Sequence, residues 1–350
     1  MDIMPGQTKR GRIKCLVWDL DNTLWDGTLL EDEHVHLKPG VQDVIQTLDA
    51  RGILHSIASK NEPDPALRKL AEFGLAEYFL YPQINWNSKA ASIQAIAEAL
   101  NIGLDAIAFI DDQLYERAEV AYSFPQVFCL SASELDNLLT MPEFNPRWIT
   151  TDSKMRRHMY QADIQRKQLE EAFTGPQAAF LASLQMRLDI FPAGESDLAR
   201  AEELTVRTHQ LNSTGQTYSY AELDQFRHSK QHKLLMARLE DRFGNYGNIG
   251  LALLACGADT WEVKLLLMSC RVMSRGVGSV LLIHIMQLAR EKGVQLRADF
   301  IPNDRNRLME ITYRFAGFEE TCQSGAKIVF QHSLEHIPAF PDYLVVRTHE

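Results

Sequence analysis

The chain has 350 residues, of which 45% are hydrophobic and 23% are charged, and its formal net charge is −10. This length and apolar content suffice for packed cores and favour two domains over one. The acidic balance speaks against a protein that wraps DNA or an anionic membrane, so we expect neither as a partner. No apolar run is long enough to span a bilayer, and the start of the chain, MDIMPGQTKRGR, lacks the apolar core of a signal peptide.

The cysteines indicate a reducing compartment. They are odd in number and scattered, and they include no CxxC pair: Cys15, Cys129, Cys256, Cys270 and Cys322. This usage is typical of reduced thiols in a cytosolic protein rather than of a disulfide framework or a zinc site. We therefore expect a cytoplasmic protein.

The first part of the chain, residues 12–130, alternates apolar strands with amphipathic helices. Strands are expected at KCLVWDL, ILHSIAS, AIAFIDD and QVFCL, with helices at GVQDVIQTLDARG, PDPALRKLAEFG and SKAASIQAIAEALNIG between them. This order predicts an α/β domain with a parallel sheet and helices on both faces. Ligands bind at the carboxyl ends of such strands, where Asp19, Ser59 and Asp111 fall.

The pattern then changes twice. We expect a linker helix region over residues 136–180, where TDSKMRRHMYQADIQRKQLEEAF is a charged helix. Three antiparallel strands with turns at GNYGN and GADT follow, and after them the helix GVGSVLLIHIMQLAREKG, the strand QLRADFI and the helix NRLMEITYRFAGF. We therefore expect an α/β domain at residues 1–135, an α+β domain at residues 181–335 and a tail at residues 336–350.

The stretch LVWDLDNTLW carries the first candidate site, because Asp19, Asp21 and Thr23 form a D-x-D-x-T motif after an apolar strand. The Asp19 carboxylate can attack phosphorus, while Asp21 can protonate the leaving oxygen and then activate water. A cation would help to keep both carboxylates ionised. Asp111 and Asp112 would complete an oxygen-rich Mg²⁺ site. The side chains that we expect to bind phosphate there are Thr23, Ser59, Lys60, Asn61 and Lys89.

Four motifs in order, DLDNT, IASKN, NWNSKA and FIDD, resemble the haloacid dehalogenase-like phosphatase and phosphotransferase superfamily. The resemblance implies that Mg²⁺ is bound by the Asp19 carboxylate, the Asp21 backbone carbonyl and Asp111, with Asp112 as a second choice or an indirect partner. The gaps at 25–39 and 59–89 are too short for a cap domain. The resemblance thus implies an uncapped site, suited to a large or carrier-bound substrate or closed by the second domain.

A second candidate site lies in SCRVMSRGVGSVLL, where Cys270 stands at a strand end before a glycine-rich turn that opens a helix. Free amides at a helix N-terminus bind phosphate, and we expect phosphate contacts there from Arg271, Arg275, Gly276 and Gly278. With IPNDRN and YRFAGF, the segment resembles the GCN5-related N-acetyltransferase fold, whose helix N-terminus holds the pyrophosphate of coenzyme A beside a pantetheine groove. Met273 stands where that family usually has Arg or Gln, so the loop better suits a single phosphate.

Seven segments spread over residues 12–330 resemble the FkbH-like proteins: VWDLDNTLWDG, SKNEPD, NWNSKA, LNIGLDAIAFIDDQLYERAEV, LTVRTHQLN, DRFGNYG and SCRVMSRGVG. This resemblance implies a glyceryl transferase/phosphatase with Mg²⁺ as its cofactor. Such proteins take 1,3-bisphosphoglycerate, remove phosphate, and load the glyceryl group on the phosphopantetheine thiol of an acyl carrier protein for polyketide assembly.

An acyl phosphate is already activated, so a thiolate can attack it without ATP. Cys270 is the thiol best placed for this step, because Arg271 and Arg275 would lower its pKa from about 8.5. His209 could serve as base and Asn212 could orient the substrate, whereas His284, inside a helix, is better explained as structural. Without the family, a buried strand thiol is the simpler interpretation of Cys270.

Two other functions remain open from the sequence. One is a Mg²⁺-dependent phosphatase of a small phosphate ester, with the second domain acting only as a lid. The other is a binding or scaffold protein with an inactive phosphatase fold. The intact set of Asp19, Asp21, Lys89 and Asp111 argues against the scaffold.

Overall fold

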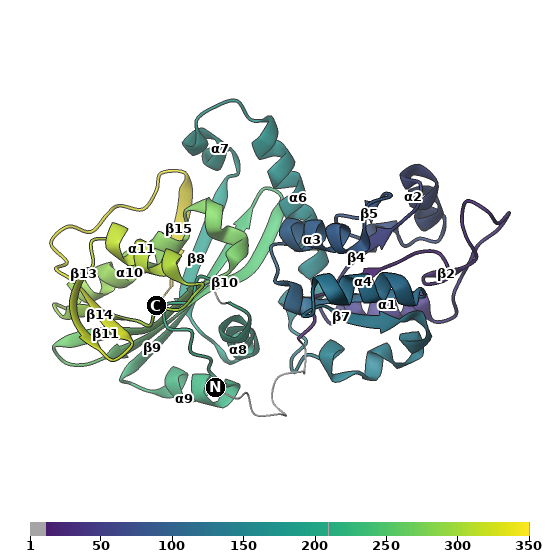
Figure 1. The fold of residues 1–350 in the computed structure, drawn as a ribbon. Coiled ribbons are helices and arrows are strands. Elements are labelled where there is room, and N and C mark those ends of the chain that lie inside the picture. The colour runs from purple at the N-terminus through teal and green to yellow at the C-terminus, as the bar shows by residue number, and fades with distance from the viewer. Residues whose placement is uncertain (1–11, 209, 350) are drawn as a thin grey trace. The chain divides into compact units, whose positions relative to one another are not determined.

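The computed structural model describes residues 12–208 and 210–349, and the side chains of Cys270 and Ser274 lie outside this description (Figure 1). The chain forms two compact units, which divide between Ile164 and Gln165. Each unit has a sheet with hydrophobic clusters of its own. Within the described residues, no helix is long and apolar enough to cross a membrane.

The first unit is built on a five-stranded sheet in the order β5-β4-β1-β6-β7, with every neighbouring pair parallel. Its strands are β1 (Cys15–Trp18), β4 (Leu54–Ser59), β5 (Gln83–Ile84), β6 (Ile107–Asp111) and β7 (Phe128–Ser131). The long helices are α1 (Val41–Ala50), α2 (Pro63–Glu72), α3 (Lys89–Leu100) and α4 (Leu114–Ser123). This is the parallel α/β arrangement that the alternation of strands and helices predicts.

The alternation of side chains along β1 explains why helices cover both faces of this sheet. Leu16 and Trp18 pack in one hydrophobic cluster together with residues of α1 and α2. Cys15 and Val17 pack in another, together with residues of α3 and α4. Since successive strand residues point to opposite faces, an unbroken apolar strand requires helices on both sides.

Only short segments connect these elements. Between β1 and α1 lies a hairpin of β2 (Trp25–Asp26) and β3 (His36–Leu37), and between β4 and α3 lie α2, η1 (Ala76–Tyr78) and β5. Buried residues of both inserts, such as Trp25, Val35 and Leu75, join the core on the α1–α2 face. The inserts therefore extend the existing core of the unit. The remaining elements are η2 (Leu104–Ala106), η3 (Ala132–Thr140), η4 (Pro142–Phe144), α5 (Thr151–Lys154) and α6 (Arg156–Ala172).

The second unit has an eight-stranded mixed sheet in the order β13-β14-β12-β11-β10-β9-β8-β15. The pairs β11–β12 and β8–β15 are parallel and the others antiparallel. The strands are β8 (Met186–Pro192), β9 (His232–Asp241), β10 (Gly244–Cys256), β11 (Thr260–Met268), β12 (Gln295–Phe300), β13 (Glu319–Ser324), β14 (Lys327–His332) and β15 (Leu344–Thr348).

Helices cover both faces of the second sheet as well. Residues of α8 (Leu198–Arg207) and α9 (Tyr220–His228) pack with Leu265 and Leu267 of β11. Residues of α7 (Gln177–Ser183), α10 (Gly278–Glu291) and α11 (Arg307–Phe315) pack with Leu266 and Met268. The short turns η5 (Glu195–Asp197) and η6 (Cys270–Arg275) precede α8 and α10. The expected fold class, a parallel α/β sheet followed by an α+β domain, is confirmed.

Three details differ from the sequence-based expectation. The turn between β9 and β10 lies at Arg242 and Phe243 rather than at GNYGN. The residues of GNYGN belong to β10, and the register of β10 against β9 shifts there. The region expected as a linker is shared: Tyr160 and Ile164 pack on the first unit, and Leu169 and Phe173 on the second. The expected tail contributes β15 to the sheet, next to β8.

Candidate active site

The carboxyl ends of three neighbouring strands bring the expected acidic motif together. Asp19 follows β1, Ser59 ends β4 and Asp111 ends β6, and β1 lies between β4 and β6 in the sheet. Because these strands are parallel, their carboxyl ends lie at one edge. The register aligns Trp18 with both Ile57 and Ile110, so the next residues of the strands reach this edge at similar heights.

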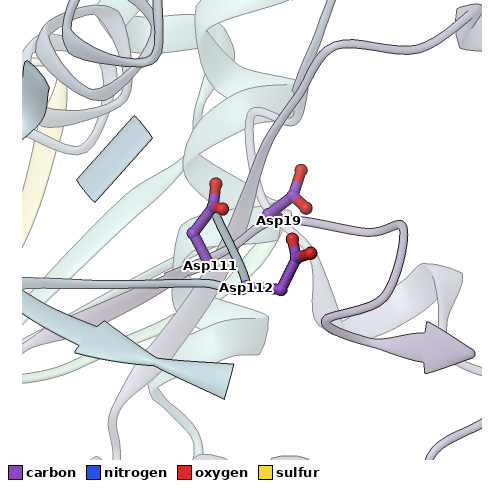
Figure 2. Close-up of side chains that lie close together, drawn as sticks. All are labelled: Asp19, Asp111 and Asp112. Atoms are coloured by element: carbon purple, nitrogen blue, oxygen red, sulfur yellow. The ribbon is translucent and has the colours of Figure 1, made fainter. Parts of the chain in front are cut away.

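Asp19, Asp111 and Asp112 form a compact cluster of carboxylates, as Figure 2 shows. One oxygen from each lies within 4.8 Å of the others. Asp19 and Asp111 are 6% and 1% exposed, whereas Asp112 is more open to solvent. Burial, together with the charge of Asp19, raises the pKa of Asp111 to about 6, and the same two causes raise the pKa of Asp112. The cluster therefore has an excess of negative charge that a cation would offset.

Lys89, the first residue of α3, is the buried cation of the cluster. Ser88 begins the helix and accepts a hydrogen bond from the Ala91 amide, which fixes where Lys89 starts. The ammonium pairs with Asp19, lies 3.2 Å from Oδ2 of Asp111, and donates to the Ala58 carbonyl at 2.8 Å. Burial by itself would lower the pKa of Lys89, but the two carboxylates outweigh burial and raise it.

One ammonium does not neutralise three carboxylates, so the donor set fits a divalent ion. The candidate side-chain ligands of this cluster are all carboxylate oxygens, which Mg²⁺ prefers. Oδ2 of Asp111 is buried and forms no hydrogen bond with a described residue; its contact is the ion pair with Lys89. Asp19, Asp111 and Asp112 are therefore the side chains that would hold Mg²⁺.

Thr23 links the two acidic segments. Its hydroxyl accepts a hydrogen bond from the Asp112 amide at 2.9 Å. The same hydroxyl lies 3.3 Å from Oδ2 of Asp19 and 3.4 Å from Oδ1 of Asp112, and its single hydrogen can serve only one of them at a time. Thr23 is 1% exposed. In this structure the Thr23 hydroxyl lies within hydrogen-bond reach of both Asp19 and Asp112.

Asp21 is held by three donors on its side chain. Oδ1 accepts from the Trp25 indole at 2.7 Å and from the Leu29 amide at 3.1 Å, and Oδ2 accepts from the Asn61 amide group at 3.0 Å. Burial raises the pKa of Asp21, and the bonds from Trp25 and Leu29 oppose that rise. Asn61, expected to bind phosphate, thus contacts the second aspartate of the motif.

The two remaining residues expected to bind phosphate near this edge occupy different settings. Ser59 is buried at the end of β4, in the strand next to Asp19. Lys60 pairs instead with Glu116 of α4 at 2.8 Å. The structure therefore brings Ser59 to the edge together with Asp19 and Asp111, while the Lys60 ammonium is engaged by α4.

The residues expected around Cys270 are engaged mainly within the second unit. Cys270 opens η6, two residues after β11, and its side chain lies outside the described part, as does all of His209. Arg271 donates to the Tyr246 carbonyl at 2.7 Å, and Arg275 pairs with Glu170 at 3.0 Å. The roles given to Cys270 and His209 stay predictions.

Two glycines and an asparagine were also expected to contact substrate or phosphate. Gly276 has φ +67°, and a Cβ there would collide with the Tyr343 hydroxyl; Gly278 begins α10 and has room for a Cβ. Oδ1 of Asn212 accepts from the amides of Thr214 and Gly215 at 3.2 and 2.9 Å, which shapes its own loop. Gly276 and Asn212 thus have structural roles that account for these residue types.

Sequence reasoning missed several residues that support the site. Arg117 donates to the Asp111 carbonyl at 2.6 Å, and the Gln113 amide donates to Oδ1 of Asp111 at 2.7 Å. Trp25 binds Asp21 from the hairpin. Trp25 lies four residues beyond Asp21, and this short spacing is the one signal that could have suggested the contact.

Comparisons with known proteins give partial structural likenesses. A scan against family models found no match, and a search of curated proteins found no significant match. The chain is similar to the N-terminal part of protein BF1531 from Bacteroides fragilis, which contains a phosphatase domain and is complexed with Mg: 31% identity over 35% of this chain and 36% of that one, with a TM-score of 0.32. The chain thus spans about a third of that relative.

Two acetyltransferases are similar over nearly their whole length. The ribosomal-protein-S18-alanine N-acetyltransferase from Escherichia coli shares 15% identity over 43% of this chain and 96% of that one, with a TM-score of 0.34. The PaiA N-acetyltransferase from Thermoplasma acidophilum, in complex with coenzyme A, shares 16% identity over 41% of this chain and 98% of that one, with a TM-score of 0.32.

Proposed function

We propose that the first unit is a Mg²⁺-dependent phosphatase and the second an acyl transferase. Together they would convert 1,3-bisphosphoglycerate, water and the phosphopantetheine thiol of an acyl carrier protein into a glyceryl thioester and two phosphates. The observation that carries the proposal is the cluster of Asp19, Asp111 and Asp112, in which buried Lys89 pairs with Asp19 and Asp111. The sequence resemblance to the FkbH-like proteins supplies the substrate and the carrier.

In the phosphatase half, Asp19 attacks the phosphorus of the 3-phosphate and forms an acyl phosphate on its own carboxylate. The bond between this phosphorus and the 3-oxygen of the glyceryl group breaks. Asp21 gives its proton to that leaving oxygen. A water molecule then loses a proton to Asp21 and attacks the phosphorus, which releases phosphate and restores both aspartates. Lys89 holds Asp19 in place and offsets charge on the phosphoryl oxygens.

Bound Mg²⁺ would supply positive charge beside the phosphoryl oxygens. Asp19, Asp111 and Asp112 are the side chains available to hold it. Thr23 and Gln113 keep two of these carboxylates in position, through the Asp112 amide and the Asp111 carboxylate. The hairpin and the segment after β4 pack into the core of the first unit rather than forming a cap domain. We therefore expect the edge that holds the acidic cluster to be open enough for a substrate on a carrier.

In the transferase half, the Cys270 thiolate attacks the carbonyl carbon of the acyl phosphate. The carbonyl–oxygen bond to the 1-phosphate breaks, so phosphate leaves and a thioester forms. The thiol of the carrier arm then attacks this thioester, loses its proton to a base for which His209 is our candidate, and frees the Cys270 thiolate. No ATP is required, because the acyl phosphate is already activated.

The phosphatase half is tested with Asp19→Asn. The full chain is incubated with Mg²⁺, 1,3-bisphosphoglycerate and holo carrier protein, and phosphate and carrier mass are measured. We expect Asp19→Asn to release one phosphate per glyceryl group loaded instead of two, leaving phosphoglyceryl on the carrier. The matched control is Asp26→Asn, in the same segment but exposed, which should release two. If Asp19→Asn still released two phosphates per glyceryl group, Asp19 would not be the nucleophile.

The transferase half is tested with Cys270→Ala against Cys322→Ala, an exposed cysteine of the same unit. We expect Cys270→Ala to leave the carrier mass unchanged while phosphate release from phosphate esters continues. Cys322→Ala should load the carrier like the parent protein. If Cys270→Ala loaded the carrier at the normal rate, the proposed thioester on Cys270 would be wrong. Turnover of generic esters with no carrier loading by the parent would instead favour a plain phosphatase.

A further inference from the structure

Large apolar side chains are exposed at the edge of the first sheet that holds the acidic cluster. They are Leu30, Trp86, Leu114 and Tyr115, whose exposed fractions are 50%, 63%, 73% and 74%. Leu30 lies between β2 and β3, Trp86 follows β5, and Leu114 and Tyr115 begin α4. These segments follow the carboxyl ends of β1, β5 and β6, which belong to one parallel sheet. We call the four residues the rim.

Backbone hydrogen bonds hold the rim next to the candidate active site. In each of the three segments, the residue directly before the rim donates its amide to a residue of the site. The pairs are Leu29 with Asp21 at 3.1 Å, Asn85 with the Ser59 carbonyl at 3.0 Å, and Gln113 with Asp111 at 2.7 Å. The rim therefore comes from three segments that each contact the site.

The two aromatic residues of the rim are fixed by contacts with neighbouring segments. The Trp86 indole donates to Oε1 of Glu62, in the segment after β4, at 3.2 Å. Tyr115 directly precedes Glu116, which is buried and pairs with Lys60 at 2.8 Å. Exposed apolar side chains that gather among polar residues mark surfaces where a partner binds. Because the rim is held in place around the site, we interpret it as such a surface.

The polar residues near the rim carry negative charge that the unit does not neutralise. Five carboxylates in residues 19–40 and 60–64 are exposed and form no ion pair with a described residue: Glu31, Asp32, Glu33, Glu62 and Asp64. The lysines of the same two segments are already paired, Lys38 with Asp26 at 3.7 Å and Lys60 with Glu116. A surface of this charge attracts cationic groups and repels anionic ones.

We infer that the rim is a docking surface for a protein partner that presents apolar side chains flanked by lysine or arginine. The apolar side chains of the partner cover the rim, and its cations meet the five unpaired carboxylates. A partner in this position also shields the acidic cluster from water, because the rim segments contact the site. The inference goes beyond the proposed function, since it rests on exposed side chains and their charge rather than on the reacting groups.

The test uses the full chain and two synthetic amphipathic peptides with the same leucines, one with lysine and the other with glutamate at the polar positions. Tryptophan emission reports binding, because Trp86 is exposed whereas Trp18, Trp25 and Trp261 are buried. We expect the lysine peptide to bind one to one and to shift the emission to shorter wavelength, a change that Trp86→Phe removes. Absence of binding, or equal binding of both peptides, would overturn the inference, whether or not glyceryl loading is observed.

Two matched pairs of variants check that the lysine peptide binds at the rim. Tyr115→Ser alters the rim, whereas Tyr122→Ser alters a tyrosine of α4 outside it that is 90% exposed. We expect about tenfold weaker binding by calorimetry for Tyr115→Ser, as for an aromatic anchor of an interface, and unchanged binding for Tyr122→Ser. Glu33→Lys should weaken binding more than Glu98→Lys, at an exposed position of α3. Equal affinity of all four variants would show non-specific attraction to an acidic protein and would contradict the inference.

Discussion

At the scale of single residues, the site shows how hydrogen bonds position a motif carboxylate. Asp21 accepts three hydrogen bonds, from Trp25, Leu29 and Asn61. All three groups are donors, and together they fix the orientation of the Asp21 side chain. Asn61 comes from the segment after β4, forty residues along the chain. The motif spacing indicates the chemistry of Asp21, but its contact with Asn61 follows from the pairing of β1 with β4.

His55 on β4 is a buried group whose ionisation bears on stability. Nδ1 accepts from the Trp18 indole at 3.0 Å, and Nε2 lies 3.0 Å from the Ile45 carbonyl, to which it donates. These partners suit the neutral ring. Burial lowers the pKa of His55 to about 4, and the charge of Arg157 acts in the same direction. The folded protein therefore binds this proton less readily than the unfolded chain.

We predict that His55 lowers the free energy of unfolding as the pH falls. Because its folded pKa is below the unfolded value of about 6.5, its contribution is complete above that pH and is lost as the pH falls toward 4. From pH 7 to pH 4, the parent should lose about 2–3 kcal/mol more unfolding free energy than His55→Gln, which keeps a donor and an acceptor. Urea unfolding at several pH values measures this.

The comparison with a variant is essential because Asp111 acts in the opposite sense. Its pKa is raised to about 6, so its contribution is present at low pH and is lost as the pH rises through 6. Asp111 is common to the parent and to His55→Gln, so their difference isolates His55. His34→Gln, at an exposed position, is the control. Equal pH dependence of the parent and His55→Gln would contradict the prediction.

At the scale of elements, one buried ion pair ties α6 to the β9–β10 hairpin. Arg166 pairs with Asp241 through two bonds of 2.7 and 2.8 Å, and both side chains have no exposed surface. Asp241 also accepts from the Phe243 amide and the Tyr246 hydroxyl. These bonds account for a turn at Arg242 and Phe243. The glycines of GNYGN suggested a turn, but they accommodate register shifts in β10 instead.

We predict that Arg166→Met destabilises the protein by about 3–5 kcal/mol, since it leaves the Asp241 carboxylate buried without its cation. Arg166→Met combined with Asp241→Asn should be less destabilised than Arg166→Met alone, because no buried charge remains. Arg187→Ala removes an exposed ion pair on the neighbouring strand and should cost less than about 1 kcal/mol. Urea unfolding measures all three. A double variant no more stable than the single one would contradict this account.

At the scale of the whole molecule, the chain has two units with separate hydrophobic clusters. The acidic cluster belongs entirely to the first. Binding of an ion to the folded state stabilises the structure that holds it, and the effect grows with ion concentration. The separate cores and the placement of this acidic cluster in the first unit therefore have a consequence for thermal unfolding.

We predict two calorimetric unfolding transitions, of which Mg²⁺ raises only one. At a Mg²⁺ concentration 100 times its dissociation constant, the first unit should gain about 2.7 kcal/mol over the protein in a chelator. Asp111→Asn should reduce this gain, whereas Asp26→Asn, at an exposed position, should leave it unchanged. A shift of both transitions, or of neither, would show that the ion does not bind as we infer.

The order of strands and helices and the motif residues are enough to predict the fold class and the residue types of the candidate site. Strand and helix periodicity follows from local burial, and parallel strands place their carboxyl ends at one edge, so Asp19, Ser59 and Asp111 could be expected there together. Which side chains meet depends on the three-dimensional packing: Lys60 pairs with Glu116, Asn61 binds Asp21, and residues 211–213 bond to β11. Such contacts join residues far apart in the chain, and their geometry depends on packing that no local pattern encodes.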